Sequence, residues 1–546
     1  MNKQSKKSKK LFNDGTKALF NNDYIEALDT LIQSLENKPS DIPIWINIGI
    51  TQTRIKKYQQ AIETFNFILQ LDSNNFHALA GLAYVYYCSG NLNQAISLGE
   101  TVYNVKKESW VHLIYAEILC AFQPDRQTRL DIYKLWGEKY ANHLSIGQPT
   151  LNPNKDPSRK LRIGYVSGDM KHHSVAYFME PVFSNHNHDQ VDVYVFATNH
   201  NKDQTTERLK SLIPHWFDVA TLDDKALLKL IRHNKIDILI DLSGHTSDHR
   251  LFVFAKRAAP IQLTWLGFMG TLGMNAIDYR LTDFGADPIG SEQWYVERLF
   301  RLECMASYCP PADSPLALEP PLSSQTPTLI SLNASKKITD NMLLIWKRIL
   351  EARPDANLIL HVTDNSIDEA INTMLPKLEQ LEMPLDQISI SPQVPITEFM
   401  ERGLVADIAL DTHPISGGTT TLHALWMGLP VIAMEAEDAM SSSTARTLQG
   451  LGLSEWVANN EEEYIQIVLN LIEDKERLRK HRAEIRDILS QSALMNYKAR
   501  CTELERSFRL MWFNYLLGES RYLQSNFDLA IETDYLRQKL GLNIGN

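Results

Sequence analysis

The first hundred residues of this chain repeat at a fixed interval. Small residues lie near the start of each copy, and the larger side chains of Leu31 and Phe65 recur in two of the three copies. Three sets of positions recur with a step of 34 residues. Two sets hold small residues and one holds large ones: Gly15, Gly49 and Ala83; Ala27, Ala61 and Ala95; and Tyr24, Tyr58 and Leu92. Small residues let two helices approach, and large ones fill the space between helix pairs. The spacing predicts stacked helix–turn–helix units.

This interval is the period of tetratricopeptide repeats. We predict a basic tail at residues 1–10 and a tetratricopeptide superhelix of about three repeats at residues 11–105. The concave face of such a stack usually binds a peptide or protein, which predicts a protein acceptor or partner. The alternative is that the repeats only dock onto the rest of the chain.

The remaining chain is too long for one core and changes in pattern after residue 158. Residues 106–158 are predicted to be a helical linker that ends in the turn-rich stretch 152–158. Two α/β halves follow, at 159–315 and 316–546, joined through the proline-rich segment 309–327. Strand-like segments alternating with helices predict two Rossmann-like parallel sheets facing a cleft: 161–166, 191–196, 236–241 and 261–265, then 329–332, 357–362, 387–390, 408–410 and 430–434.

Composition excludes several classes of protein. Hydrophobic residues make up 44% and charged residues 22% of the chain, as in globular proteins, and no apolar run is long enough to predict a membrane span. The net charge of −11 argues against nucleic-acid binding, although the N-terminus is rich in lysine. The five cysteines are scattered and never form Cys-x-x-Cys, so we expect neither disulfides nor zinc. With no secretory signal pattern, a cytoplasmic protein is predicted.

One turn in the second α/β half is suited to binding an anion. The strand at 408–410 ends in Asp411, Gly417 and Gly418 follow, and a helix is predicted from Thr419 until Gly428 ends it. A helix start offers unpaired N–H groups and the positive end of the helix dipole, which favours a phosphate. The alternative is an ordinary strand-to-helix turn without a ligand.

Motifs in both halves resemble the tetratricopeptide-bearing protein O-N-acetylglucosaminyltransferase family, and the related O-fucosyltransferases of the Spindly branch. The resemblance covers essentially the whole chain, with repeats followed by two α/β halves. It rests on Asp241–Thr246, Arg250, Ala259–Gly267, Gly270–Thr271, Asp278–Tyr279, Thr282–Asp283, Ser331–Lys337, the helix end at 346–354, and the Gly417–Gly428 turn and helix.

The resemblance implies a glycosyltransferase B fold, a nucleotide-sugar donor, inversion at the anomeric carbon and no metal. The residues agree about the metal, because the chain contains no Asp-x-Asp, the usual means of presenting Mg²⁺ or Mn²⁺ to a pyrophosphate. A cation must then balance the leaving phosphate. Lys337 matches the lysine that contacts the pyrophosphate in the family, although Lys336 is adjacent.

The resemblance also assigns a catalytic pair to the first half. Asp169 and His173 match the aspartate and histidine beside the sugar and the acceptor, and a histidine is suited to removing a hydroxyl proton. We therefore predict His173, Asp169 and Lys337 as catalytic residues, with His172 as the residue most easily confused with His173. The predicted nucleotide-sugar-binding residues are Gly267, Arg402, Gly417, Gly418, Thr419, Thr420 and His423.

Several positions depart from the family pattern. His423 replaces an aspartate that binds ribose, and Gly418 replaces a histidine. Ile396 and Phe399 occupy the places of a nucleotide-contacting lysine and histidine, residues 174–175 replace Pro-Thr, and 441–443 lack an arginine of bacterial relatives. The pattern predicts that phosphate binding is retained, while the departures concern the base, the ribose and the sugar.

The predicted function is transfer of a sugar from a nucleotide donor to Ser or Thr of a protein, with no cofactor besides the donor. UDP-N-acetylglucosamine (UDP-GlcNAc) is the favoured donor, and GDP-fucose, UDP-glucose or a flagellin-type sugar are the alternatives. A second hypothesis is a non-catalytic repeat scaffold whose transferase half has decayed. Association into a homo-oligomer is left open.

Overall fold

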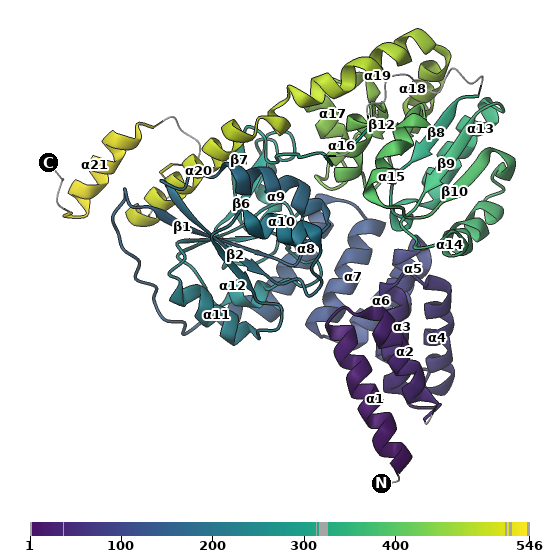
Figure 1. The fold of residues 1–546 in the computed structure, drawn as a ribbon, viewed down its shortest axis with the longest axis horizontal. Helices are drawn as coiled ribbons and strands as arrows, with labels where there is room; N and C mark the ends of the chain where they lie inside the picture. The colour runs from purple at the N-terminus through teal and green to yellow at the C-terminus, as the bar shows by residue number, and fades with distance from the viewer. Residues whose placement is uncertain are drawn as a thin grey trace. The chain divides into compact units, whose positions relative to one another are not determined.

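The computed structural model describes residues 3–36, 38–312, 314–315, 326–518, 521–522 and 527–542. The chain divides into two compact units, each built from two stretches (Figure 1). Unit 1 contains Met1–Thr128 and Pro310–Leu489, and unit 2 contains Arg129–Cys309 and Ser490–Asn546. Much of the proline-rich segment, including Pro320 and Pro321 and the predicted boundary between 315 and 316, lies outside the described residues.

The repeats form antiparallel helix pairs at the start of unit 1. Gly15 lies against Leu31 and Gly49 against Phe65, at distances that leave no room for a larger side chain, so the predicted small–large pairing is confirmed. The helix α1 begins at Lys3, inside the segment set apart as a basic tail. The pairs are α1 (Lys3–Phe20) and α2 (Tyr24–Leu35), α3 (Ile42–Arg54) and α4 (Tyr58–Leu71), and α5 (Phe76–Cys88) and α6 (Leu92–Val105).

Two further helices continue the stack, α7 (Ser109–Phe122) and α8 (Arg126–Trp136). The boundary between the units falls inside α8, after Thr128. The predicted linker 106–158 is therefore shared between the units, with α7 in unit 1 and residues 129–158 in unit 2.

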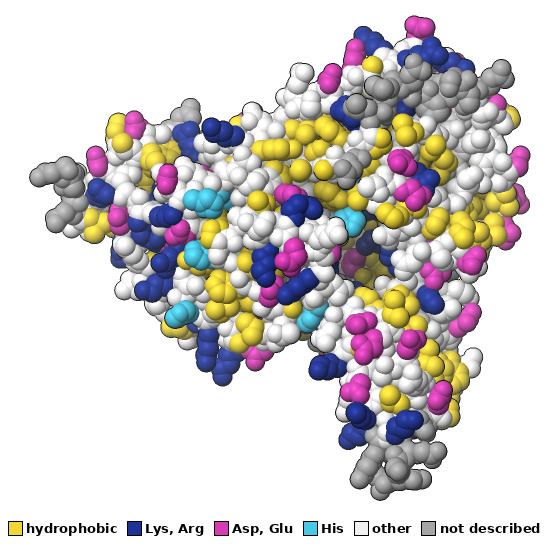
Figure 2. All heavy atoms as spheres, viewed as in Figure 1, with side chains coloured by type: hydrophobic (Ala, Val, Ile, Leu, Met, Phe, Trp, Pro, Cys, Tyr) yellow, Lys and Arg dark blue, Asp and Glu magenta, His cyan; other side chains and the backbone are white. Residues whose placement is uncertain are grey.

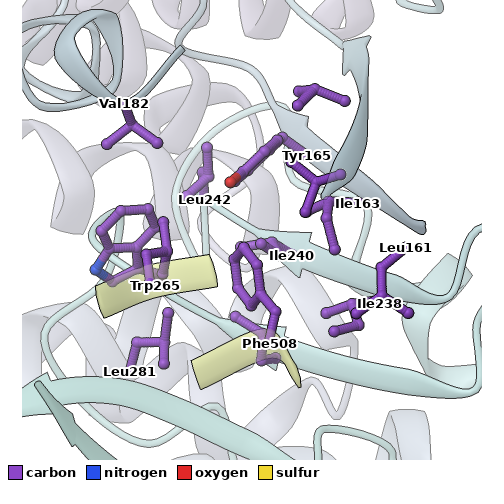
Figure 3. Close-up of a cluster of buried hydrophobic side chains, with 14 of the residues drawn as sticks. Leu161, Ile163, Tyr165, Val182, Ile238, Ile240, Leu242, Trp265, Leu281 and Phe508 are labelled. Atoms are coloured by element: carbon purple, nitrogen blue, oxygen red, sulfur yellow. The ribbon is translucent and has the colours of Figure 1, made fainter. Parts of the chain in front are cut away.

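Unit 2 contains a seven-stranded sheet in the order β3-β2-β1-β4-β5-β6-β7, with parallel pairing throughout. Its core joins apolar side chains of the strands to Val182 of α9 (Ser174–Asn185) and Phe508 of α20 (Tyr497–Leu517) (Figure 3). The prediction places α20 in the second half, whereas the apolar face of α20 completes this core. The strands are β1 (Leu161–Ser167), β2 (Val191–Ala197), β3 (His215–Asp218), β4 (Ile238–Asp241), β5 (Ile261–Thr264), β6 (Tyr279–Asp283) and β7 (Arg298–Leu302).

Helices connect these strands as the parallel pairing requires. After α9 they are α10 (Gln204–Ser211), α11 (Asp224–His233) and α12 (Leu251–Ala255), and α21 (Leu529–Lys539) follows α20 near the C-terminus.

Unit 1 contains a six-stranded parallel sheet in the order β10-β9-β8-β11-β12-β13. Its strands are β8 (Thr328–Ser331), β9 (Asn357–His361), β10 (Ile388–Ser391), β11 (Ile408–Leu410), β12 (Val431–Met434) and β13 (Val457–Ala458). Its α-helices are α13 (Asp340–Ala352), α14 (Ile367–Gln380), α15 (Ile396–Met400), α16 (Thr419–Trp426), α17 (Ser443–Gly450), α18 (Glu461–Glu473) and α19 (Lys475–Ser490).

Both predicted parallel sheets are confirmed, together with the nine strands that alternate with helices. The sequence analysis missed β3, β6, β7 and β13. The edge strand β3 has four residues with no fully buried position, and β13 has two residues. Neither is long enough to show a strand period.

The repeats pack against the rest of unit 1, where α4 contacts α14 (Figure 1). The side-chain amide of Asn365 donates to the carbonyl of Ile55 at 2.7 Å. The repeats thus dock onto the rest of unit 1.

The surface agrees with the composition. On the face shown in Figure 2, acidic and basic side chains are intermixed. Within the described ranges, no helix has both the length and the apolar character needed to cross a bilayer.

Candidate active site

A buried aspartate organises the turn after β11 in unit 1. Asp411 is 4% exposed, and its Oδ1 accepts hydrogen bonds from the backbone N–H of Gly417 at 2.7 Å and from Asn333 at 3.3 Å. Burial raises the pKa of this carboxyl group. The aspartate therefore fixes the backbone just before the helix α16.

The two glycines of this turn have different requirements. A Cβ on Gly417 would lie 2.4 Å from the hydroxyl of Thr421 and 2.9 Å from Asp411, so only glycine fits. A Cβ on Gly418 would meet nothing closer than 3.9 Å, which leaves room for the larger residue of the family pattern.

Thr419 and Thr420 open α16 as predicted, and Gly418 is its N-cap residue without a side-chain cap. The first-turn N–H groups of a helix have no partner inside the helix. With two hydroxyls beside them, these groups can bind a phosphate.

Lys337 lies beside this turn, in the short 3₁₀ helix η5 (Ser335–Lys337). Its ammonium donates to the carbonyl of Ser416 at 2.7 Å. Burial lowers its pKa to about 8; the carboxylate of Asp411 opposes this and the ammonium of Lys336 adds to it. Lys336 instead makes an ion pair with Glu117 of α7 at 3.3 Å. The geometry thus distinguishes the two adjacent lysines and favours Lys337 for the anion.

Aromatic rings and a guanidinium gather at the ends of β9 and β10. Arg402 donates to the hydroxyl of Ser391 at 3.1 Å, and the Nδ1 of His361 lies 3.2 Å from the same hydroxyl. The ring of Phe399 lies 5.2 Å from that of His361 and 5.9 Å from that of His423. Burial lowers the pKa of His361 to about 4, with Arg402 adding to the effect.

This aromatic group offers neutral faces and one cation, which suits stacking on a planar base. It contains Arg402 and His423 from the predicted site, and His423 is 4% exposed. The sequence analysis missed His361, although its place at a strand end was a usable signal.

The predicted catalytic pair lies in unit 2, just after β1. Asp169 Oδ1 lies 3.6 Å from the Nδ1 of His173, which also accepts a hydrogen bond from the N–H of Val175 at 3.3 Å and so caps α9. Burial raises the pKa of Asp169 and lowers the pKa of His173. The His173 side chain is 43% exposed, so a neutral imidazole remains open to a substrate.

The neighbouring His172 is held elsewhere. Its N–H donates to Asp203 at 2.7 Å, and its Nε2 lies 3.1 Å from the hydroxyl of Tyr177.

Gly267 lies in a turn packed on the end of β4. A Cβ there would lie 1.9 Å from the carbonyl oxygen of Leu242, so the position admits only glycine. Beside it, Asp241 accepts from the N–H of Gly244 at 2.9 Å and from the hydroxyl of Thr264 at 2.9 Å. Asp169, His173 and Gly267 belong to unit 2, and the other predicted site residues belong to unit 1.

Among the described residues, one group of side chains has ligand atoms close enough to hold a metal ion: His186, Cys501 and Glu505, all within 4.8 Å of one another. These atoms already pair with each other, and the Nε2 of His186 lies 2.9 Å from the hydroxyl of Tyr165. None of the predicted site residues belongs to this group.

Two parallel sheets preceded by helical repeats are the architecture of a glycosyltransferase of the B-fold type. The family model described as glycosyl transferase family 41 matches residues 146–306 and 323–504. The chain therefore belongs to glycosyl transferase family 41, and the predicted resemblance is confirmed.

Relatives agree with this membership. The chain is 34% identical over 396 residues to the probable UDP-N-acetylglucosamine–peptide N-acetylglucosaminyltransferase SPINDLY of Arabidopsis thaliana, which covers 71% of this chain and 43% of the relative. It is 30% identical over 407 residues to the enzyme of the same description named SEC, also from Arabidopsis thaliana, over 70% of this chain and 41% of the relative. The chain thus spans less than half the length of these curated relatives.

A solved structure extends the similarity over almost the whole chain. The O-GlcNAc transferase of Thermobaculum terrenum, determined as a lysine-to-methionine mutant, is 31% identical with a TM-score of 0.87. The match covers 94% of this chain and 99% of that chain. The predicted fold class is confirmed.

Proposed function

We propose that this chain transfers N-acetylglucosamine from UDP-GlcNAc to a Ser or Thr hydroxyl of a protein. Membership of family 41 supports a glycosyltransferase, and the printed names of the relatives support this donor and a peptide acceptor. The observation that carries the proposal is the arrangement of Lys337, Asp411 and Gly417 before α16.

The leaving group is a nucleoside diphosphate, whose charge grows as the bond to the anomeric carbon breaks. Lys337 neutralises this charge, while the N–H groups and the hydroxyls of Thr419 and Thr420 at the start of α16 donate to it. Ring stacking by Phe399 and the cation of Arg402 contribute to binding the nucleoside.

Because lysine and backbone donors balance the charge of the diphosphate, we expect transfer to persist in excess EDTA. Loss of activity in chelator, restored by Mg²⁺ or Mn²⁺, would contradict this reading.

The acceptor hydroxyl must lose its proton as its oxygen attacks the anomeric carbon. His173 accepts this proton, since its lowered pKa keeps the imidazole neutral near pH 7. Asp169, at 3.6 Å, orients the ring and stabilises the imidazolium that forms. The new glycosidic bond then lies on the face opposite the departing diphosphate, so the configuration inverts.

The repeats are proposed to bind the acceptor protein. A groove of about 500 Å³ lies in the third repeat, lined by Leu82, Tyr86, Asn93, Gln94, Ser97 and Leu98. Its mixture of apolar side chains and side-chain amides suits an extended peptide, whose backbone needs hydrogen-bond partners.

A nucleotide panel tests the proposal. We expect UDP to raise the melting temperature, because a ligand at 100 times its Kd adds about 2.7 kcal/mol to stability. GDP in the same panel tests the alternative donor GDP-fucose. If no nucleotide changed the melting temperature, the non-catalytic scaffold would be the better description.

A second experiment addresses the acceptor. Mass spectrometry of host proteins with and without the gene would identify the modified protein and the mass of the added sugar.

A further inference from the structure

The two adjacent lysines of η5 are held by different parts of unit 1. Lys337 donates to Ser416 beside the anion-binding turn. Lys336 pairs with Glu117 of α7 at 3.3 Å, and its ammonium lies 5.0 Å from the ring centre of Tyr87 on α5. The segment that carries the proposed phosphate lysine is therefore also fixed to the repeat helices.

A second junction joins the same segment to the repeats. The ammonium of Lys377, on α14, donates to the carbonyls of Gly90 at 3.1 Å and Ile338 at 3.0 Å. Gly90 follows the C-cap of α5 with φ +79°, and a Cβ there would lie 2.8 Å from the carbonyl oxygen of Ser335. The turn after α5 thus touches both ends of η5.

η5 has only three residues and cannot hold its shape alone. Ser335 gives it one further anchor, through a hydrogen bond to the buried Asp364 at 2.7 Å. Within the described part of the chain, Lys337 makes a single hydrogen bond through its ammonium. Its position therefore depends on what holds the backbone of η5, and much of that support comes from the repeats.

We propose that Glu117 and the Gly90 turn of the repeat helices, acting through Lys336 and Lys377, are positioning groups that place Lys337 on the diphosphate of the donor. This inference rests on the proposed function and adds a second role to the repeats. Besides binding an acceptor, they complete the donor site, and rearrangement of α5 against α7 changes donor turnover.

The alternative is that these contacts only stabilise the docked repeats. The two interpretations predict different changes in the charge of Lys337 when Lys336 or Glu117 is substituted. The ammonium of Lys336 lowers the pKa of Lys337, whereas Asp411 raises it. Glu117 raises the pKa of Lys336 although burial opposes this, and balances its charge. Four further titratable groups near Lys336 have pKa values raised by burial or by Glu117 and stay neutral near pH 8: Tyr58, Tyr84, Tyr87 and Cys88. The cation of Arg54 acts on Tyr84 and Cys88 as well and keeps its charge in all the variants compared.

The affinity for UDP should fall as the pH rises through about 8, because Lys337 then loses its charge. Lys336→Met removes a like charge, so the midpoint of this fall should move to higher pH by about half a unit or more. Glu117→Gln leaves Lys336 unbalanced, so the midpoint should move to lower pH. A role in stability alone predicts no shifts of opposite sign.

The experiment uses the full chain with UDP as the probe, in calorimetry across a pH series centred on about 8. Transfer rates at saturating UDP-GlcNAc should fall about threefold to tenfold in Lys336→Met and in Glu117→Gln, as misplaced groups slow chemistry. The double variant should be no slower than the slower single one, because both changes break one contact. Lys336→Arg, which keeps the charge and the ion pair, should restore most of the rate and the wild-type midpoint.

Glu63→Gln is the matched control, because Glu63 on α4 accepts from Gln59 of the same helix and should leave affinity and rate unchanged. Unshifted midpoints together with additive rate effects would overturn the inference while the wild-type enzyme still binds UDP and transfers sugar. A wild-type chain that neither binds UDP nor transfers would instead contradict the proposed function.

Discussion

The turn after β4 in unit 2 and the turn after β11 in unit 1 are built alike but have different consequences. Each has a buried aspartate at the strand end, Asp241 and Asp411, which accepts from backbone N–H groups of the following turn. Asp241 also accepts from Thr264 of the next strand, so donors of its own turn and sheet surround it. Asp411 likewise accepts from Asn333, beyond the end of the neighbouring strand, but it also faces Lys337, whose ammonium makes one hydrogen bond within the described residues.

The comparison shows how one local device serves two purposes. Where the turn itself and the next strand supply the donors, the aspartate closes a structural turn. Where a neighbouring cation keeps donors to spare, the same kind of turn can bind an anion, which is the role we propose for the turn after β11. In unit 2, the residue that we propose for the chemistry is His173, an exposed side chain beside the buried carboxylate of Asp169.

The largest expected effect comes from His173. His173→Ala should lower the transfer rate by about 10²–10⁴, the usual contribution of a general base. UDP affinity should stay near wild type, because the imidazole acts on the acceptor. Since burial lowers the His173 pKa from 6.5, the acid limb of the rate profile should lie below that pH.

Single-turnover transfer rates and UDP calorimetry check this prediction together. His172→Ala is the matched control, since that ring is held by Tyr177 and should leave the rate near wild type. If His173→Ala weakened UDP binding about tenfold while transfer at saturating donor stayed normal, the roles assigned to the two units would be wrong.

Lys337 should give the next largest effect. Lys337→Ala should lower the transfer rate by about 10²–10³, as expected for a lost donor to developing charge, with a smaller loss of UDP affinity. Equal losses in both quantities would show ground-state binding alone. Unchanged rates would place the diphosphate elsewhere and remove the contrast between the two turns.

Much of this architecture could be predicted from the sequence. The 34-residue period gave the paired small and large residues of the repeats, and Gly417 and the threonines after it gave the start of α16. These are local patterns, in which spacing alone determines the neighbours. The strands β3 and β13 could not be predicted because they are too short to show the alternating period of a strand.

The contacts between distant segments could not be predicted. Lys336 and Glu117 lie 219 positions apart, and nothing in either segment indicates the pairing. The contacts of His361 could not be predicted either: its place at the end of β9 indicates a candidate site, but Phe399 on α15 and Arg402 in the 3₁₀ helix after it are brought to it only by the fold. The sequence predicts Lys337 as the lysine for the phosphate, whereas its contact with Ser416 and the ion pair of its neighbour Lys336 are visible only in the structure.

An effect of intermediate size is expected from Asp411→Asn, in the turn after β11. Its Oδ1 can still accept from Gly417, so the turn should keep its shape. The carboxylate raises the pKa of Lys337, and its removal should move the pH midpoint of UDP affinity about one unit below about 8. Calorimetry over a pH series measures this midpoint. A midpoint that stayed in place would mean that Lys337 does not control the affinity.

The smallest effect on the reaction is expected from Asp241→Asn, the matched change in the closed turn, which should leave UDP affinity unchanged. Its effect is on folding. Burial raises the pKa of Asp241 from 3.8 to about 6, so the native state binds more protons than the unfolded state between these values. The stability contributed by this group is therefore present at low pH and is lost as the pH rises to about 6, by up to about 3 kcal/mol.

Urea unfolding of both proteins across this pH range tests the prediction. Asparagine does not titrate, so the free energy of unfolding of wild type relative to the variant should fall as the pH rises from 3.8 to about 6. A difference independent of pH, or weaker UDP binding by the folded variant, would show that the turn after β4 is not the closed counterpart of the turn after β11.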